Sequence, residues 1–179
     1  MAFGNPIPIG TPVAFDGAAS TTKDFTLGNP TAGRVLNFAV AARRSTTGAP
    51  AANITVAVSG GATWSFERQQ AQNTQNNRHT LAVFRGIVPA SPGTGLTATF
   101  TSDQGINRWE IAAWEEDAAD VTYYGTVTGE STSATPSVTL AAAPATADYK
   151  MGVIASVGGS SGVDPGDTAA MTEAVIAAL

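Results

Sequence analysis

The residue types that most often perform catalysis are scarce in this sequence. His79 is the only histidine among the 179 residues, and there is no cysteine. Without cysteine there is no thiolate nucleophile, no disulfide framework and no Cys-ligated metal. A metal or triad role for His79 would need neighbouring carboxylates or a Gly-x-Ser-x-Gly elbow, and neither lies near it. The sequence therefore predicts no catalytic residue, no metal site and no cofactor, with His79 at a strand edge.

Three glutamates provide the densest group of carboxylates, at Glu110, Glu115 and Glu116. A glycosidase needs two carboxylates roughly 5 to 10 Å apart across a cleft. Glu110 and Glu116 would share a face if one strand ran through both, but Asp117 and Asp120 indicate that the strand ends earlier. We therefore expect a solvated acidic strand end and keep the glycosidase pair as the weaker alternative.

The tryptophans are the candidates for carbohydrate binding. Exposed rings of Trp64, Trp109 or Trp114 could stack on sugar rings, whereas buried rings would pack in a core. Because two of the three lie on segments with an alternating pattern, core packing is the preferred interpretation.

Any such site would have to be positioned by strands, because the hydrophobic pattern is that of β-structure. Arg34 to Arg43 is the clearest strand, and its apolar residues do not alternate strictly, which predicts burial on both faces. Gln69 to Arg78 has no large apolar residue and reads as an exposed loop. Further strands are expected at Lys23 to Leu27, Ile54 to Val58, Trp64 to Phe66, Leu81 to Val88, Leu96 to Phe100 and Trp109 to Ala113.

The last third of the chain continues the same pattern. Strands are expected at Val121 to Thr128, Ser137 to Leu140 and Tyr149 to Val157. The tail from Thr172 to Leu179 fits either a final strand or a helix capped by Asp167, and the surrounding strands favour a strand. About ten short strands with turn signals between them predict an all-β fold, an antiparallel β-sandwich of jelly-roll or immunoglobulin-like type.

The first residues form an extended N-terminal arm in this interpretation. Prolines at positions 6, 8 and 12 block a helix there. The arm is either a floppy terminus or a segment that docks on a neighbouring subunit, because its large apolar residues are costly to leave in water. The predicted organisation is an arm over residues 1–20 and one sandwich domain over residues 21–179. The candidate assembly-binding residues are Phe3, Ile7, Ile9, Val13 and Phe15.

Composition excludes several classes of partner. The formal net charge of −5 argues against a protein that neutralises nucleic-acid phosphates. No run of 18 apolar residues exists, so a membrane-spanning helix is not expected. The first ten residues lack the basic and apolar regions of a secretory signal peptide, which indicates folding in a cytosol.

Several strand sequences resemble a β-sandwich module of tailed-phage virion structural proteins that also occurs in bacterial surface proteins. Gly-Arg-Val-Leu-Asn-Phe-Ala-Val-Ala-Ala-Arg at Gly33 to Arg43 is similar to its opening strand, typically Asn-Arg-Leu-Leu-Val-Val-Ala-Val-Ser-Trp-Arg. The segment from Ile54 to Trp64, with Gly60-Gly61, resembles the hairpin that follows. The likeness covers Lys23 to Val157 and includes His79 to Phe100, Arg108 to Trp114, Ser131 to Pro136 and Asp148 to Val157.

This resemblance implies a non-enzymatic structural protein of a tailed-phage virion, assembled in the cytoplasm of the bacterial host. The first expectation is a capsid decoration or cement protein that binds the shell and stabilises it. Its partners would be the major capsid protein or other virion subunits, and it would form a homo-oligomer. A tail or baseplate component is one alternative, and a carbohydrate-binding or host-attachment module is another.

Overall fold

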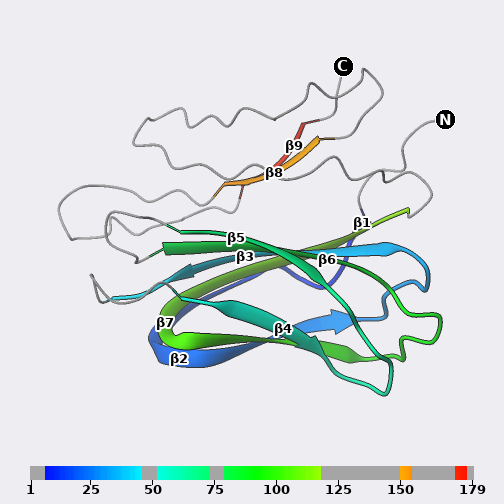
Figure 1. The fold of residues 1–179 in the computed structure, drawn as a ribbon, viewed down its shortest axis with the longest axis horizontal. Coiled ribbons are helices and arrows are strands. Elements are labelled where there is room, and N and C mark those ends of the chain that lie inside the picture. The colour runs from blue at the N-terminus through cyan, green and yellow to red at the C-terminus, as the bar shows by residue number, and fades with distance from the viewer. Residues whose placement is uncertain (1–6, 46–51, 73–78, 118–149, 155–171, 177–179) are drawn as a thin grey trace. The chain divides into compact units, whose positions relative to one another are not determined.

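The computed structural model describes residues 7–45, 52–72, 79–117, 150–154 and 172–176 (Figure 1). The chain divides into two units, Met1–Ala141 and Ala142–Leu179. Every regular element in the described residues is a β-strand, and every described pairing is antiparallel. The strands of the first unit are β1 (Ile7–Pro8), β2 (Val13–Gly28), β3 (Val35–Arg43), β4 (Ile54–Val58), β5 (Glu67–Gln72), β6 (His79–Ile87) and β7 (Leu96–Glu116).

The second unit contributes two described strands, β8 (Lys150–Ile154) and β9 (Thr172–Ile176). They pair with each other, with Lys150 opposite Ile176 and Ile154 opposite Thr172. The tail is therefore a strand over Thr172–Ile176, which confirms the preferred interpretation of that segment. The strands predicted at 121–128 and 137–140 lie outside the described residues.

One strand, β7, belongs to both layers of the first unit. Its C-terminal half pairs with β3 on one edge and with β1 and the start of β2 on the other. Its N-terminal half pairs with the end of β2 and with β4. The first layer thus has the order β5, β6, β3, β7 and the β1/β2 edge, and the second layer has β4, β7 and β2.

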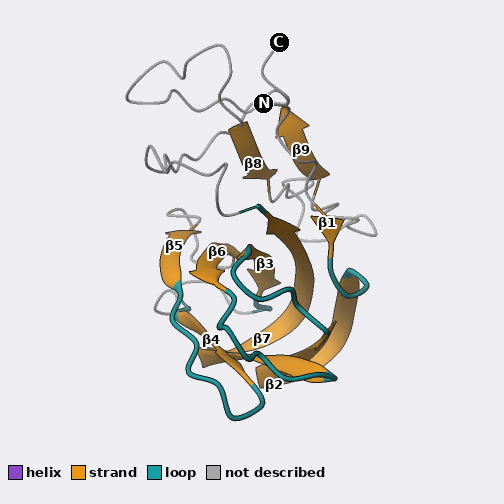
Figure 2. Cartoon of the chain, turned by 90° about the vertical axis from the view of Figure 1, so that its right-hand side faces the viewer, coloured by secondary structure: helices purple, strands orange, loops and turns teal. Residues whose placement is uncertain are grey.

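The two layers are connected through a bend that β2 and β7 share. Figure 2 shows β7 curving from one layer into the other. The register of β2 on β7 shifts between Asp16 and Ser20, and again between Ser20 and Thr22, which marks bulges at the bend. Bulges increase local bending and twist, so a pair of long strands can fold over onto itself. The predicted all-β antiparallel sandwich is confirmed.

The core between the layers is centred on Phe38 of β3. Its ring lies edge-on to Phe100 of β7 at a centroid distance of 5.3 Å and to Phe25 of β2 at 6.3 Å. Phe66 approaches the same ring at 5.6 Å. Aromatic pairs at these separations contribute about 0.5–1.5 kcal/mol each beyond the burial of their surface. The alternating burial of β6 and of the first half of β7 directs apolar side chains into this core.

Side chains of β5 close one open side of the sandwich. Gln70 accepts a hydrogen bond from the Ile54 amide at 3.1 Å and donates to the Ala52 carbonyl at 2.7 Å. Arg68 donates to the Ile54 carbonyl at 2.8 Å and to the Asn53 side chain. These bonds satisfy backbone groups at the start of β4, which would otherwise be an open edge.

Three local predictions were wrong. The exposed loop was predicted to begin at Gln69, but Gln69–Gln72 belong to β5 and pair with β6. Trp64 and Phe66 precede β5 and lie outside any strand. The strands expected at 96–100 and 109–113 are parts of a single strand of 21 residues. Pairing with strands far away in the sequence determines where each of these strands begins and ends, and local composition does not predict that pairing.

The predicted arm leads directly into the sandwich. Ile7 and Pro8 pair with Glu115 and Trp114, and β2 runs without a break through residue 20. Among the described residues, no helix has the length and apolar character needed to cross a membrane.

The arm crosses close to β2 at Gly10, and this contact leads to a stability prediction. Gly10 has a φ of +67°, and a Cβ there would lie 2.5 Å from the Thr26 carbonyl oxygen and 2.7 Å from the Phe25 ring. We expect Gly10→Ala to lower the free energy of unfolding by more than about 2 kcal/mol, from backbone strain plus displacement of packed atoms. Urea denaturation measures the change.

Gly33→Ala is the matched control, because Gly33 also has a positive φ, of +79°, but a Cβ added there would have no neighbouring atom within 4 Å. That change should cost only the strain of the left-handed conformation, about 1–2 kcal/mol. Equal losses for the two variants would show that Gly10 makes no close contact with β2.

Candidate functional site

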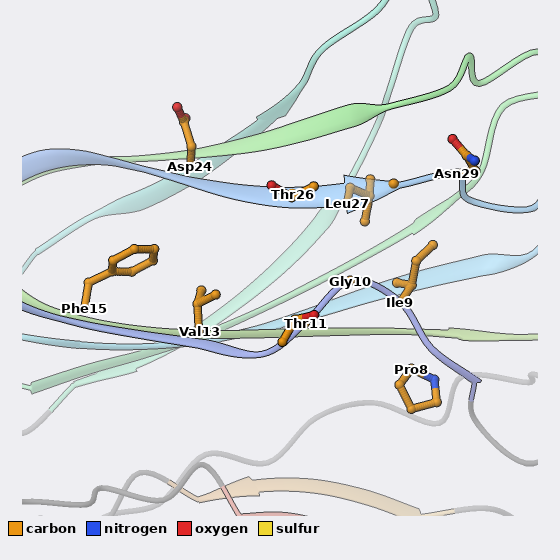
Figure 3. Close-up of a pocket in the computed structure, with 11 residues that line it drawn as sticks. Pro8, Ile9, Gly10, Thr11, Val13, Phe15, Asp24, Thr26, Leu27 and Asn29 are labelled. Carbon is orange, nitrogen blue, oxygen red and sulfur yellow. The ribbon is translucent and has the colours of Figure 1, made fainter.

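A groove lies between the arm and the second half of β2, on the side of the sandwich that β5 does not close. Its volume is about 510 Å³. Figure 3 shows the arm along one wall and β2 along the other. It is lined by Pro8, Ile9, Gly10, Thr11, Val13, Phe15, Asp24, Thr26, Leu27, Gly28 and Asn29.

The apolar residues of the groove come from edge strands of the two layers. Ile9, Val13 and Phe15 belong to the edge of the first layer and pack against the core while remaining partly exposed. Leu27 of β2 is fully buried on the opposite wall. In Figure 3 the side chains of Val13 and Phe15 point from the arm toward β2. The groove is therefore an incompletely covered extension of the hydrophobic core.

Two charged residues of β2 bear on this groove: Asp24 lines it, and Lys23 contacts the ring of Phe15, which lines it. The Lys23 ammonium lies 4.0 Å from the centroid of the Phe15 ring, a cation–π contact that shields this ring from water. The Asp24 side chain is exposed, points away from the arm and accepts a hydrogen bond from the Thr99 hydroxyl at 2.6 Å. Asp24 is the one lining residue with a titratable side chain. The Asp24 carboxylate thus points out of the groove, and the apolar residues that line the groove suit binding better than proton transfer.

The groove brings together part of the predicted assembly-binding set. Ile9, Val13 and Phe15 line it, whereas Ile7 lies beside it on β1 with 48% of its surface exposed. Phe3 lies outside the described residues. The apolar arm was recognised in the sequence, but the opposing wall formed by Asp24 to Asn29 was not. The spacing of apolar and polar residues in Asp24 to Asn29 did not indicate that this stretch would face the arm.

The tryptophans are packed mainly in the protein interior. Trp109 and Trp114 are 1% and 2% exposed, so core packing is confirmed for both and neither ring offers a face to a sugar. Trp64 is partly exposed and stacks on Phe66, with centroids 6.0 Å apart and planes 5° apart. Of the three predicted candidates for sugar stacking, only Trp64 keeps a partly exposed side chain.

The glutamate cluster also differs from its prediction, because the three carboxylates are buried. Glu110, Glu115 and Glu116 are 6%, 3% and 9% exposed, since β7 continues through Glu116. Each carboxylate has a partner within the protein: Arg108 for Glu110 at 2.8 Å, the Thr31 amide for Glu115 at 2.5 Å and the Trp114 indole for Glu116 at 3.0 Å. These partners provide the hydrogen bonds that a buried carboxylate needs.

The spacing along β7 also argues against Glu110 and Glu116 acting as a glycosidase pair. Six residues of extended strand separate them, which corresponds to about 20 Å. That distance is at least twice the separation that either glycosidase geometry uses.

His79 lies at the start of β6, opposite Arg43 of β3, as the strand-edge prediction stated. In the described part of the chain, no three His, Asp or Glu residues are grouped closely enough to hold a metal ion.

A second polar feature, which sequence reasoning missed, is the buried side chain of Asn37 on β3. It is 0% exposed, and neither its amide nitrogen nor its amide oxygen has a hydrogen-bond partner. Burying an unpaired amide costs about 1–3 kcal/mol. Its cross-strand neighbours are Arg85 and Trp114. Because the neighbours along β3 are apolar, the sequence reads here as a plain buried strand.

Comparison with known proteins provides no relative: no family model matches the chain, and no curated protein or solved structure matches it. The functional argument therefore depends on the groove and on the sequence pattern.

The tryptophan environments predict a limited response to an aqueous quencher. Iodide should reach Trp64 and leave Trp109 and Trp114 emitting, because ionic quenchers do not penetrate the core. Trp64→Phe should remove most of the quenchable fluorescence in a Stern–Volmer titration. Full quenching of the folded protein would contradict the described burial.

Stability measurements can test whether the buried amide of Asn37 is unpaired. Asn37→Leu should raise the free energy of unfolding by about 1 kcal/mol, since it replaces an unpaired buried amide with an apolar group of similar shape. Urea denaturation provides the measurement. The control is Asn107→Leu, because Asn107 accepts from the Ser45 amide at 2.8 Å and donates to the Gly17 carbonyl at 3.2 Å. That variant should lose about 1–2 kcal/mol, and a comparable loss at Asn37 would mean that its amide is paired.

Proposed function

We propose that this protein is a non-enzymatic structural subunit of a tailed-phage virion, and that it decorates and stabilises the capsid shell. It would bind the major capsid protein or other virion subunits through its arm side. The observation that carries the proposal is the groove: the apolar residues of the predicted assembly arm line an open surface, partly apolar and partly polar, at one side of a β-sandwich.

The fold supports the resemblance on which the proposal depends. The module of phage virion proteins implies an antiparallel β-sandwich over the matched residues, and the described strands form one. The segments that carry the likeness include β3, β4, β6 and most of β7. Of these, β3, β6 and β7 are interior strands, and β4 is an edge strand of the second layer.

The two open sides of the sandwich differ, and this difference supports a contact on the arm side. One open side is closed by hydrogen bonds of Arg68 and Gln70, so its edge is already satisfied. The other open side carries half-covered Val13 and Phe15 and exposed Ile7. Covering such residues stabilises a complex, by about 25 cal/mol for each Å² of apolar surface removed from water.

The role of the arm in shell binding cannot be tested by deleting residues 1–15. That deletion would take away β1 and the first part of β2, which pair with β7, and would damage the fold. A point variant on the exposed surface avoids this problem.

The test uses shells of the encoding phage assembled without this protein, with bound copies counted after co-sedimentation and by electron microscopy. Ile7→Ser should weaken shell binding about five- to tenfold, because about 1 kcal/mol of apolar burial is lost. Ile87→Ser is the matched control: Ile87 is 55% exposed and lies on β6, which β7 and β3 separate from β1 in the sheet. Absence of wild-type binding to shells, with the protein found at the tail instead, would overturn the decoration role.

A further inference from the structure

An aspartate is followed directly by a glycine at one place in the sequence, Asp16-Gly17, and Asn-Gly does not occur. In such a pair the amide nitrogen of the second residue can approach the side-chain carboxyl of the first, because glycine has no Cβ to obstruct it. The pair lies on β2 at the start of the bend, where the predicted arm continues into the rest of the strand.

We propose that Asp16 is a site of spontaneous isomerisation in the folded protein, at which aspartate converts to isoaspartate through a succinimide formed with Gly17. This covalent change of the main chain needs no enzyme. It depends on the local structure of the bend and is independent of the proposed function.

The reaction balances with water as its only other participant. The Gly17 amide nitrogen attacks the Cγ of the protonated Asp16 carboxyl, a C–N bond forms, and the nitrogen's proton leaves with the carboxyl's hydroxyl as water. Water then opens the ring. Addition at the former side-chain carbonyl restores aspartate, whereas addition at the main-chain carbonyl breaks the original peptide bond and leaves isoaspartate. The product has the same mass and one additional carbon atom in its backbone.

The Asp16 carboxyl is accessible and weakly held. Its side chain is 68% exposed, and its ion pair with Arg108 spans 3.5 Å. Arg108 makes its shorter contact, of 2.8 Å, with Glu110. Exposed ion pairs contribute little to stability, so this one leaves the Asp16 side chain free to turn toward the following amide. Asp24, on the same strand, instead accepts a hydrogen bond from the Thr99 hydroxyl at 2.6 Å.

The backbone ladder between β2 and β7 is interrupted directly after Asp16. The next paired residue of β2 is Ser20, so three residues of β2 lie opposite a single residue of β7. Closing a five-membered ring turns the backbone out of the extended conformation, which a continuous ladder of hydrogen bonds would oppose. A Cβ placed at Gly17 would have no atom within 4 Å, so the ring has room to form.

The same interruption accommodates the product. Asn107 of β7 donates to the Gly17 carbonyl at 3.2 Å and accepts from the Ser45 amide at 2.8 Å, which holds the bulge from the β7 side. The additional backbone atom enters where the register already shifts, and the pairs on either side of the bulge can keep their partners. The reaction therefore does not require unfolding.

The test is incubation of the native full chain at physiological temperature, followed by labelling with protein isoaspartyl methyltransferase and peptide mapping. Label should accumulate in the peptide that contains Asp16, and faster in mildly acidic than in mildly alkaline buffer, because the carboxyl reacts in its protonated form. Asp16→Glu is the matched control: it keeps a carboxylate for Arg108, but its ring would have six members and closes far more slowly. This variant should lose the label.

Asp16→Asn provides a second measurement. It forms the same succinimide with loss of ammonia, so its mass should rise by the difference between an amide and an acid, and faster in alkaline buffer. The native protein and the chain unfolded in urea should convert at rates of the same order. Conversion confined to urea, label found only at other aspartates, or label that persists in Asp16→Glu would overturn the proposal.

Discussion

The backbone ladder of β7 is the constraint on which the rest of the first unit depends. This single strand pairs with β1, β2, β3 and β4, so both layers take their position from it. Because β2 follows β7 around the bend, the two layers are connected by continuous strands and not only by loops. The core around Phe38 forms where this shared pair folds over β3 and β6.

The same arrangement makes the two open sides of the sandwich unlike each other. On one side, β4 and β5 are short and close enough for Arg68 and Gln70 to bridge them. On the other side, β2 forms the edge of both layers, and the wider first layer extends beyond the second. The asymmetry results from strand number, and it leaves Val13 and Phe15 partly exposed where a two-layer fold would normally bury them.

The sequence predicted the class of the fold well because burial periodicity is local. The burial of β3 on both faces and the alternation in Leu96, Ala98 and Phe100 could be read directly from neighbouring residues. The length of β7 could not, because Gln104 to Asn107 look like a turn and become strand only through their pairing with β2 and the bend. The burial of Glu115 and Glu116 was missed for the same reason.

The groove was predicted only in part. Phe15 and Val13 stood out as costly apolar residues on a proline-rich arm, which led to the assembly interpretation. Their opposing wall at Asp24 to Asn29 belongs to the same strand after its bend, and no sequence pattern reports a strand that returns to face its own beginning. The lack of hydrogen-bond partners at Asn37 was not predicted, because one polar residue in a run of apolar residues gives no information about its partners.

The antiparallel pairing of β1 with the end of β7 also has a mechanical consequence. Ile7 lies opposite Glu115, so the chain enters and leaves this set of strands at the same end. Tension applied between residues 7 and 117 acts perpendicular to the two strands and breaks their backbone hydrogen bonds one pair after another. Tension that runs along the length of β2 instead loads many pairs at once. A subunit held only by its arm would therefore yield at its first pairs, whereas one gripped along the groove would share the load over the whole β2–β7 ladder.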